Sequence, residues 1–346
     1  MTVVAVRAPR PSATSTRPSA LPRLLCPFTL ALLASHCRCD APDGGAPAEP
    51  STSASVARPV PSEGPPPQLL YLPDGGDVAP GTAPDNPRVQ LGGSHASSCP
   101  PEMVDVRGQF CIDRYEAILV DAKTGERLSP YYAPERVHVR TEFRRYSIGR
   151  PTAETVAART HPVPEPPRFE LEREFSPRAE VRAGEIPNGY VSGDLAKVAC
   201  QNAGKRLCRE VEWVTACRGE QDRDHPYGDG YVQNQCNVFR EAHPAALLHG
   251  NASINHLDPR LNMLRGPSGK PLLQPTGAYP TCASQWGDDR VYDLVGNLAE
   301  WVDDEHGAFL GGFYSRSTRE GCARKVTAHP NHYFDYSLGV RCCLSK

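Results

Sequence analysis

Two carboxylates flank a tight-turn signal in residues 291–302, which read VYDLVGNLAEWV. Asp293 precedes the dipeptide Gly296-Asn297, which favours a turn between apolar runs, and Glu300 follows it. Side-chain carboxylates together with backbone carbonyls are the ligands that calcium prefers. The segment therefore predicts a calcium site at the turn. The alternative is that Asp293 caps the turn and Glu300 is solvated.

A second set of ligand residues lies in the segment AHPNHYFDY near the C-terminus. His329, His332 and Asp335 supply two imidazoles and one carboxylate, which is the ligand set of non-haem iron oxygenases. Spacing within a loop constrains geometry poorly, so these side chains could equally be surface residues. We expect calcium as the cofactor and keep an iron site as the alternative.

Charge and hydropathy argue against a nucleic-acid partner and against a transmembrane helix. The formal net charge is −2, and the sequence lacks the basic stripe that is typical of nucleic-acid-binding proteins. The sequence also lacks an apolar run of 18 residues, which a transmembrane helix would need. Three arginines, Arg316, Arg319 and Arg324, could bind an anion or a peptide carboxylate, or could be solvated.

The cysteines indicate an oxidising compartment. The chain of 346 residues contains 13 cysteines, and structural disulfides are rare in cytosolic proteins. Setting aside Cys26, Cys37 and Cys39 near the N-terminus leaves an even number, but spacing alone does not give the connectivity. Cys99 and Cys111 flank a predicted turn and could pair across it.

The N-terminal third predicts export and a tether. Residues 1–37 combine a basic leader with the short apolar stretch Leu24–Leu33, as in a signal peptide. The pattern resembles a bacterial lipoprotein signal in which Cys37 is acylated; a plain secretory signal is the alternative. Residues 38–98 are rich in Pro, Ala, Gly and Ser and predict a disordered tether. We therefore expect an exported bacterial protein of the cell envelope, lipid-anchored or secreted.

A hairpin and two helices are predicted in the remaining chain. Residues 99–120 alternate in hydrophobicity around a turn at Gly108, whereas 121–185 lack periodicity and predict an irregular insertion. One helix is capped by Ser192 or Asp194 and runs to about 203, and the second covers 209–218. The apolar positions expected to face the core are Leu195, Val198 and Ala199 in the first helix and Val211, Val214 and Cys217 in the second.

Five blocks together resemble the sulfatase-modifying-factor family, whose founding activity is that of the formylglycine-generating enzyme. The blocks are AGKRLCREVEWVTACRG (203–219), CNVF (236–239), VYDLVGNLAEWV (291–302), GGFY (311–314) and GVRCC (339–343). The resemblance covers residues 99–346, with 121–185 poorly matched. It implies an α+β domain, a loop-rich, disulfide-stapled variant of the C-type-lectin-like fold.

The resemblance also implies a missing catalytic pair. Active family members carry two cysteines shortly after the GG-x-Y block, which bind copper(I) and oxidise a cysteine of a sulfatase with dioxygen. Here Ser315, Arg316, Ser317 and Thr318 occupy the place of the first thiol. Cys322 fits the family's structural disulfide. Copper is therefore not expected.

The family pattern further implies disulfide pairs and calcium ligands. The matching blocks imply the bridges Cys200–Cys342 and Cys217–Cys322, and Cys236–Cys282 would close the loop-rich middle. Cys208 and Cys343 remain, and a bridge between them is consistent with the even count, although spacing leaves their connectivity open. Asp293, Gly296, Leu298 and Glu300 match a family calcium loop through two carboxylates and two carbonyls. Asn237 and Val238 match part of a second calcium site.

The leading functional interpretation is an accessory or binding module that holds a peptide, a protein segment or a small ligand in the groove beside the double glycine. It would lack formylglycine-generating activity. The alternative is a divergent metal-dependent oxidoreductase that uses His329, His332 and Asp335. A true generator with a displaced cysteine is the third interpretation.

Overall fold

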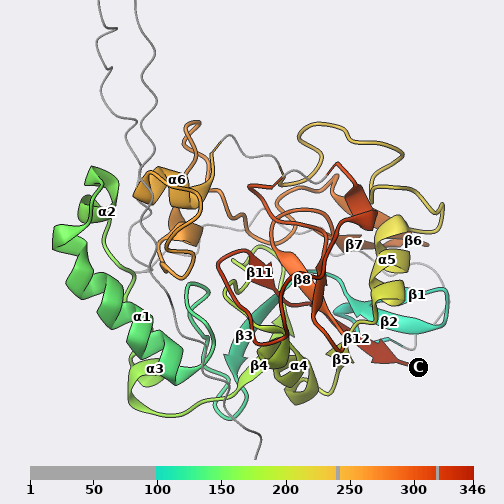
Figure 1. Ribbon diagram of the computed structural model, residues 1–346. Coiled ribbons are helices and arrows are strands. Elements are labelled where there is room, and N and C mark those ends of the chain that lie inside the picture. The colour runs from blue at the N-terminus through green and yellow to red at the C-terminus, as the bar shows by residue number, and fades with distance from the viewer. Residues whose placement is uncertain (1–98, 239–241, 317–318) are drawn as a thin grey trace, which may run out of the picture. The chain divides into compact units, whose positions relative to one another are not determined.

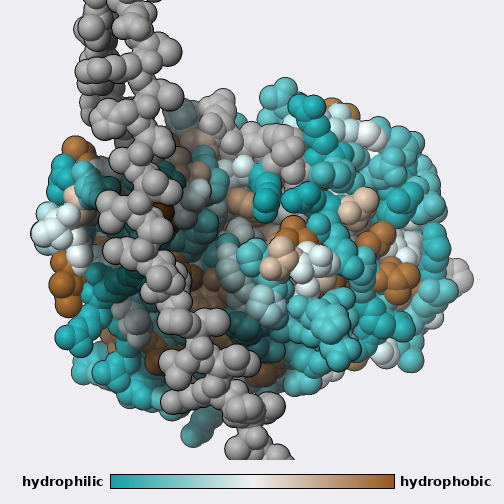
Figure 2. All heavy atoms as spheres, viewed as in Figure 1, coloured by the Kyte–Doolittle hydropathy of each residue, from teal (hydrophilic) through white to brown (hydrophobic). Residues whose placement is uncertain are grey.

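The computed structural model describes residues 99–238, 242–316 and 319–346 (Figure 1). The predicted leader and tether, with Cys37, lie outside the described residues. Within the described ranges, no helix is long and apolar enough to cross a membrane. The visible face is mainly hydrophilic, with separate hydrophobic patches instead of one large one (Figure 2).

The described residues form a mixed α+β fold of short strands (Figure 1). One sheet has the order β1 (Met103–Val106), β2 (Phe110–Asp113), β12 (Cys342–Ser345) and β5 (Arg206–Leu207). A second has the order β10 (Lys325–Val326), β9 (Ala308–Leu310), β8 (Ala299–Val302) and β11 (Leu338–Gly339). Two-stranded sheets pair β3 (Ala117–Asp121) with β4 (Pro177–Val181) and β6 (Ala283–Trp286) with β7 (Asp289–Tyr292). Because β12 lies between β2 and β5, the C-terminal strand joins the start of the domain to its middle.

The predicted hairpin is confirmed. Val106 pairs with Phe110 across the turn of β1 and β2, and Gly108 lies in the turn at φ +69°. A side-chain carboxylate, that of Asp105, accepts a hydrogen bond from the Gly108 N–H at 2.8 Å. The left-handed backbone conformation costs least at glycine, which explains this turn residue.

Both predicted helices are present, but the faces that they bury differ in part from those expected. α4 (Gly193–Asn202) begins at Ser192, whose hydroxyl accepts from the Leu195 N–H, and α5 (Glu210–Arg218) ends at Gly219. Val198 is 36% and Val211 65% exposed. Ala199 and Cys217 face the core as predicted, together with Ala196 and Cys200 in α4 and Trp213 and Ala216 in α5. Each helix is held by a disulfide, which turns the face with the cysteine inward.

The expectation of an irregular insertion over 121–185 is corrected by the structure. The segment contains α1 (Arg136–Gly149), a 3-10 turn η1 (Arg150–Thr152), α2 (Val156–Thr160), α3 (Arg168–Glu172) and strand β4. α1 buries only Val139, Glu142 and Tyr146. Val139, Phe143 and Tyr146 recur at helical spacing, but the exposed Val137 and Ile148 blur this pattern and most other positions are polar, so the helix was missed. The remaining short helices are α6 (Pro244–His249), η2 (Leu261–Met263) and η3 (Gly321–Ala323).

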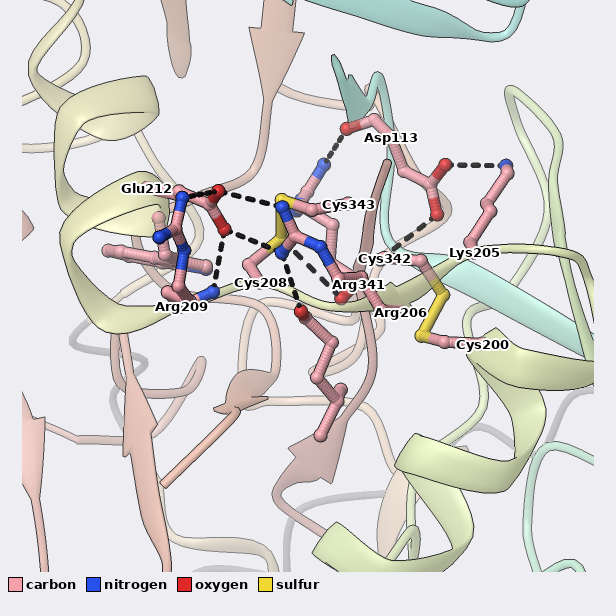
Figure 3. Close-up of a disulfide and its surroundings, with 12 residues drawn as sticks. Asp113, Cys200, Lys205, Arg206, Cys208, Arg209, Glu212, Arg341, Cys342 and Cys343 are labelled. Carbon is pink, nitrogen blue, oxygen red and sulfur yellow. Dashed lines mark hydrogen bonds and ion pairs between the residues drawn. A yellow bond between two sulfur atoms is a disulfide. The ribbon is translucent and has the colours of Figure 1, made fainter. Parts of the chain in front are cut away.

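Ten cysteines form five disulfides, which include the two pairs that the family blocks implied and join Cys208 to Cys343, whose connectivity the sequence left open. The pairs are Cys99–Cys111, Cys200–Cys342, Cys208–Cys343, Cys217–Cys322 and Cys236–Cys282. Figure 3 shows the adjacent bridges of Cys342 and Cys343, which tie β12 to α4 and to the start of α5. Around them, Lys205 pairs with the buried carboxylate of Asp113 at 2.7 Å. No free thiol therefore remains among the described residues.

Candidate functional site

The turn at Gly296-Asn297 lies in the core and connects several loops. Both residues have positive φ, +87° and +54°. A Cβ at Gly296 would lie 2.4 Å from the carbonyl oxygen of Asn237, so only glycine fits there. The Asn297 N–H donates to that same carbonyl at 3.0 Å, and the Asn297 side-chain amide donates to Glu116 at 2.5 Å. The structure thus brings CNVF, a block 60 residues away, into contact with the predicted calcium turn.

Glu300 is held by a buried ion pair. Its carboxylate accepts hydrogen bonds from Arg341 Nε at 2.8 Å and Nη2 at 2.7 Å, and from Trp213 Nε1 at 2.6 Å. Arg341 and Glu300 are 0% and 1% exposed. Glu300 is therefore not a solvated side chain, and both its oxygens already have donors.

Negative charge exceeds positive charge around this turn. Asp293 and Glu116 are buried beside Glu300, and Arg341 is the cation that faces all three carboxylates. Burial raises the pKa of Asp293 to about 7, although the Gly277 N–H and Arg341 act in the opposite direction. Burial and the neighbouring carboxylates raise the pKa of Glu116 well above its usual range. This surplus of buried carboxylates suits a bound cation.

The fit to calcium is good at Asp293 and partial at Glu300. Asp293 forms no ion pair among the described residues, and its Oδ2 accepts one hydrogen bond, from Gly277 N–H at 2.6 Å. No three His, Cys, Asp or Glu side chains within 99–238, 242–316 and 319–346 could hold a metal ion together. The predicted calcium loop would instead bind the ion through two carboxylates, those of Asp293 and Glu300, and through the backbone carbonyls of Gly296 and Leu298. At the second predicted site, the Asn237 side-chain amide donates to Leu272 O and to Asn297.

A cavity of about 490 Å³ lies beside the double glycine. Four of the predicted site residues, Arg316, Arg324, His329 and Asp335, line it. Aromatic rings form much of its wall, from Phe309, Phe313, Tyr333 and Tyr336. The structure therefore brings two of the three predicted groove arginines, Arg316 and Arg324, to a cavity with cationic and aromatic walls.

Two predicted residues lie elsewhere. His332 is exposed and does not line the cavity. Arg319 is also exposed, with its guanidinium 5.8 Å from the ring centre of Tyr231. The predicted iron set of His329, His332 and Asp335 is thus not brought together.

Hydrogen bonds fix Asp335 in place. Its Oδ2 accepts from the Tyr333 hydroxyl at 2.7 Å, and its Oδ1 accepts from the Ser337 N–H and hydroxyl at 2.8 and 2.6 Å. The His329 ring stacks on the ring of Tyr333, with the centres 3.9 Å apart. These contacts shape the cavity wall and leave Asp335 fully occupied by local donors.

Two cavity histidines were missed by sequence reasoning. His243 contacts the Tyr336 hydroxyl through Nε2 at 2.9 Å, and His256 contacts Ala252 O through Nε2 at 2.8 Å. Burial and the neighbouring His256 lower the pKa of His243. Both lie in loop-rich sequence more than 50 residues before the GG block, and no local motif marks them.

The position of the expected first thiol is occupied by a hydroxyl and a guanidinium. The Ser315 hydroxyl donates to Ala242 O at 3.1 Å, and Arg316 lines the cavity. Ser317 and Thr318 lie outside the described residues. Cys322 is bonded to Cys217 at the other end of this loop. The described part of the site has no pair of thiolates for copper.

Known proteins match this chain over its C-terminal half. The family model of the sulfatase-modifying factor enzyme 1-like domain matches residues 165–343. Inactive C-alpha-formylglycine-generating enzyme 2 of Bos taurus is 30% identical over 171 residues, 46% of this chain and 50% of the relative. The Mus musculus protein of the same name is 29% identical over 119 residues, 34% and 32% of the two chains. The chain thus spans half or less of the length of these curated relatives.

Solved structures with a similar course of the chain include PvdO from Pseudomonas aeruginosa and CarF. PvdO is 14% identical with a TM-score of 0.32, covering 68% of this chain and 80% of PvdO. CarF is 12% identical with a TM-score of 0.31, covering 68% and 86%. The sequence match, which spans more than half of the chain and includes all five blocks whole, decides the assignment. The chain belongs to the family of sulfatase-modifying factor enzyme 1-like domains.

Proposed function

We propose that this formylglycine-generating-enzyme-like domain is a binding or accessory module without copper-dependent oxidation of cysteine. The single observation that carries the proposal is the engagement of all ten cysteines between 99 and 346 in disulfides. Copper(I) chemistry of this kind needs soft thiolate ligands, and a disulfide sulfur is not a thiolate. The names of the two curated relatives, which describe inactive enzymes, support it.

The cavity beside the double glycine is the proposed binding groove. Arg316 lines it and forms no ion pair with any described residue, while Arg324 pairs only with Glu320, at 3.4 Å. Arginine beside aromatic rings suits a ligand that carries both an anionic group and an apolar or aromatic part. The proposed occupant is an extended peptide of a partner protein or a small ligand of that chemistry. The oxidoreductase alternative has less support, because His332 lies away from the cavity.

Two further parts of the proposal concern metal and location. Calcium would be structural, held by Asp293 and the carbonyls of Gly296 and Leu298, with Glu300 shared with Arg341. Five disulfides favour a protein exported to an oxidising compartment, such as the bacterial cell envelope. Cys37 would carry the lipid in the anchored form.

A thiol count tests the loss of copper chemistry. The full chain, exported to an oxidising compartment, is denatured without reductant, alkylated and analysed as peptides. We expect no alkylated cysteine between residues 99 and 346 and no dioxygen consumption with copper(I) and a cysteine-containing peptide. Two reproducibly alkylated cysteines, one of them Cys322, would overturn the proposal and revive an oxidase.

Titration with 2-naphthalenesulfonate, an aromatic anion, tests the groove. We expect wild-type binding to weaken at least fivefold in Arg316→Gln, because the unpaired guanidinium in the cavity would be lost. Arg144→Gln, on the exposed face of α1, is the matched control and should bind as the wild type does. Equal binding by all three proteins would argue against this groove.

A further inference from the structure

A second cavity, of about 290 Å³, lies between helices that precede the family match and the chain around α6, which lies within that match. α1 and η1 supply Arg145, Tyr146 and Arg150, and the chain from α6 to η2 supplies His249 and Arg260. In Figure 1 these are the green helices α1 and α2 and the orange helix α6, which lie next to one another. No residue lines both this cavity and the groove beside the double glycine, so the two are separate.

Buried polar atoms around this cavity lack partners. Tyr146 is 7% exposed, and its hydroxyl has no hydrogen-bond partner among the described residues. One turn earlier on α1, Glu142 Oε2 is also buried without a hydrogen bond. His249 Nε2, by contrast, is paired with Asp258 Oδ2 at 3.0 Å. Buried polar groups are nearly always satisfied in folded proteins, so the Tyr146 hydroxyl indicates a missing partner.

The cavity is large enough for more than a water molecule. Since one water takes about 30 Å³ in the liquid, the volume corresponds to roughly ten waters. Ile254, Ala153 and Gly149 add apolar wall to the polar groups. A small organic molecule fits this combination better than a single bound water.

The polar lining consists mainly of donors. Arg150 forms no ion pair with any described residue. The carboxylate nearest to the guanidinium of Arg145 is that of Glu142, 3.8 Å away. Arg260 is neutralised by Asp258 through hydrogen bonds of 2.9 and 2.7 Å. Burial raises the pKa of Tyr146, so the hydroxyl keeps its proton and remains a donor.

One acidic residue, Glu154, also lines the cavity and is exposed. With Glu142, 3.8 Å from Arg145, two carboxylates lie near the two arginines, but neither guanidinium has a hydrogen-bond partner in the described part of the chain. Two guanidinium groups beside a buried hydroxyl donor match the geometry of carboxylate and phosphate oxygens, which accept several hydrogen bonds at once. A cationic or purely apolar ligand would leave the Tyr146 hydroxyl unsatisfied.

We propose that the cavity between α1, η1 and α6 binds a small organic oxyanion, a carboxylate or a phosphate ester. The oxyanion lies at Arg145 and Arg150, and an acceptor atom of the ligand takes the hydrogen bond of the Tyr146 hydroxyl. This site is independent of the proposed groove and of any activity there. It makes the inserted helices a second ligand-binding part of the domain.

The test uses inorganic phosphate, glycerol phosphate and citrate as probes with the full chain, at constant ionic strength set by sodium chloride. We expect at least one probe to raise the Tm of the wild type and to bind at least tenfold more weakly to R145Q/R150Q. R144Q, which changes an exposed arginine of the same helix outside the cavity, is the matched control. R316Q, in the other cavity, reports on the groove separately; both controls should bind within twofold of the wild type.

Three outcomes would overturn the proposal. They are the absence of a shift with all probes, equal binding by R145Q/R150Q and the wild type, or a loss in R144Q as large as in R145Q/R150Q. Tyr146→Phe provides a second measurement that a folding defect does not imitate. Because its hydroxyl is unpartnered in the free protein, this change should leave the ligand-free Tm unchanged or higher while it weakens probe binding. A lower ligand-free Tm with unchanged probe binding would count against the role of Tyr146.

Discussion

The pair formed by Arg341 and Glu300 is the most deeply buried ion pair that the structure describes, at 0% and 1% exposure of the side chains. Arg341 also donates to the carbonyls of Asp113 and Tyr292, at 2.8 Å each. It therefore joins strands from three parts of the chain. A buried ion pair of this kind adds little net stability over apolar residues of the same size, but removal of one partner leaves an uncompensated charge.

Arg341→Met is expected to lower the free energy of unfolding by about 3–5 kcal/mol, because Glu300, Asp293 and Glu116 would lose their cation. Urea unfolding checks this value. The double variant Arg341→Met/Glu300→Leu should recover part of the loss, since one buried carboxylate is removed as well. A single variant as stable as the wild type would contradict the role assigned to the guanidinium.

His225 is a second residue whose burial has a cost. It is 2% exposed, and neither ring nitrogen has a hydrogen-bond partner in the described part of the chain. Burial lowers the pKa of its imidazole, and the nearby Asp224 opposes this shift. The folded state therefore holds the neutral ring, whereas the unfolded chain takes up a proton near pH 6.5.

The stability that depends on neutral His225 is present above about pH 6.5 and is lost as the pH falls below that value. We expect His225→Leu to reduce the fall in the free energy of unfolding between pH 7.5 and pH 5. Urea titrations at both pH values, with wild type and variant compared, measure it. An unchanged difference between the two pH values would contradict this prediction.

Among the elements, the double glycine controls how closely two loops approach. At Gly311 a Cβ would lie 2.4 Å from the carbonyl oxygen of Leu294 and 3.1 Å from Trp213, at φ +80°. Gly108, at φ +69° in the first hairpin, has nothing within 4 Å of such a Cβ. The two glycines share the backbone conformation and differ in the space around it.

Gly311→Ala should therefore destabilise the domain more than Gly108→Ala does. The shared left-handed conformation costs about 1–2 kcal/mol with a side chain present, and only Gly311→Ala adds a backbone clash. Thermal unfolding of both variants gives the comparison. Equal losses of Tm would show that the close approach at Gly311 is not needed.

The local elements were well predicted where a short signal decides them. The cap at Ser192, the stop at Gly219 and the turn at Gly108 involve neighbours in the chain, so the sequence holds the whole signal. α1 was not predicted, because its stability comes from packing of Val139 and Tyr146 against distant segments. The buried faces of α4 and α5 were partly displaced for the same reason.

For the whole molecule, five disulfides and the proposed calcium add to the stability that three clusters of buried hydrophobic residues provide. Each disulfide typically contributes about 2–4 kcal/mol by limiting the unfolded chain. The bridges of Cys342 and Cys343 span 142 and 135 residues, so they join the C-terminal strand to helices far from it in sequence. Their effect is thus on the assembly of the domain, not on any one element.

Removal of calcium tests whether a bound calcium ion stabilises the domain. EDTA treatment of the full chain should lower its Tm, and added calcium should restore it. Free calcium at 100 times its Kd should raise the free energy of unfolding by about 2.7 kcal/mol. Asp293→Asn should weaken this response, whereas Asp303→Asn, at a half-exposed carboxylate, should retain it. A Tm that does not depend on EDTA would rule out structural calcium at this turn.

The sequence by itself determined the family blocks, the capped helices, the absence of the reactive cysteine pair and, through the family blocks, the pairs Cys200–Cys342 and Cys217–Cys322. These features depend on residue identity at fixed spacing. Only the tertiary structure decided the surroundings of each site. Glu116 reaches Asn297 across 181 residues, and His243 reaches Tyr336 across 93. His332 was separated from His329, and α1 enclosed a second cavity with α6. Such contacts form between segments that share no local signal, because packing of the whole chain, not spacing along it, brings them together.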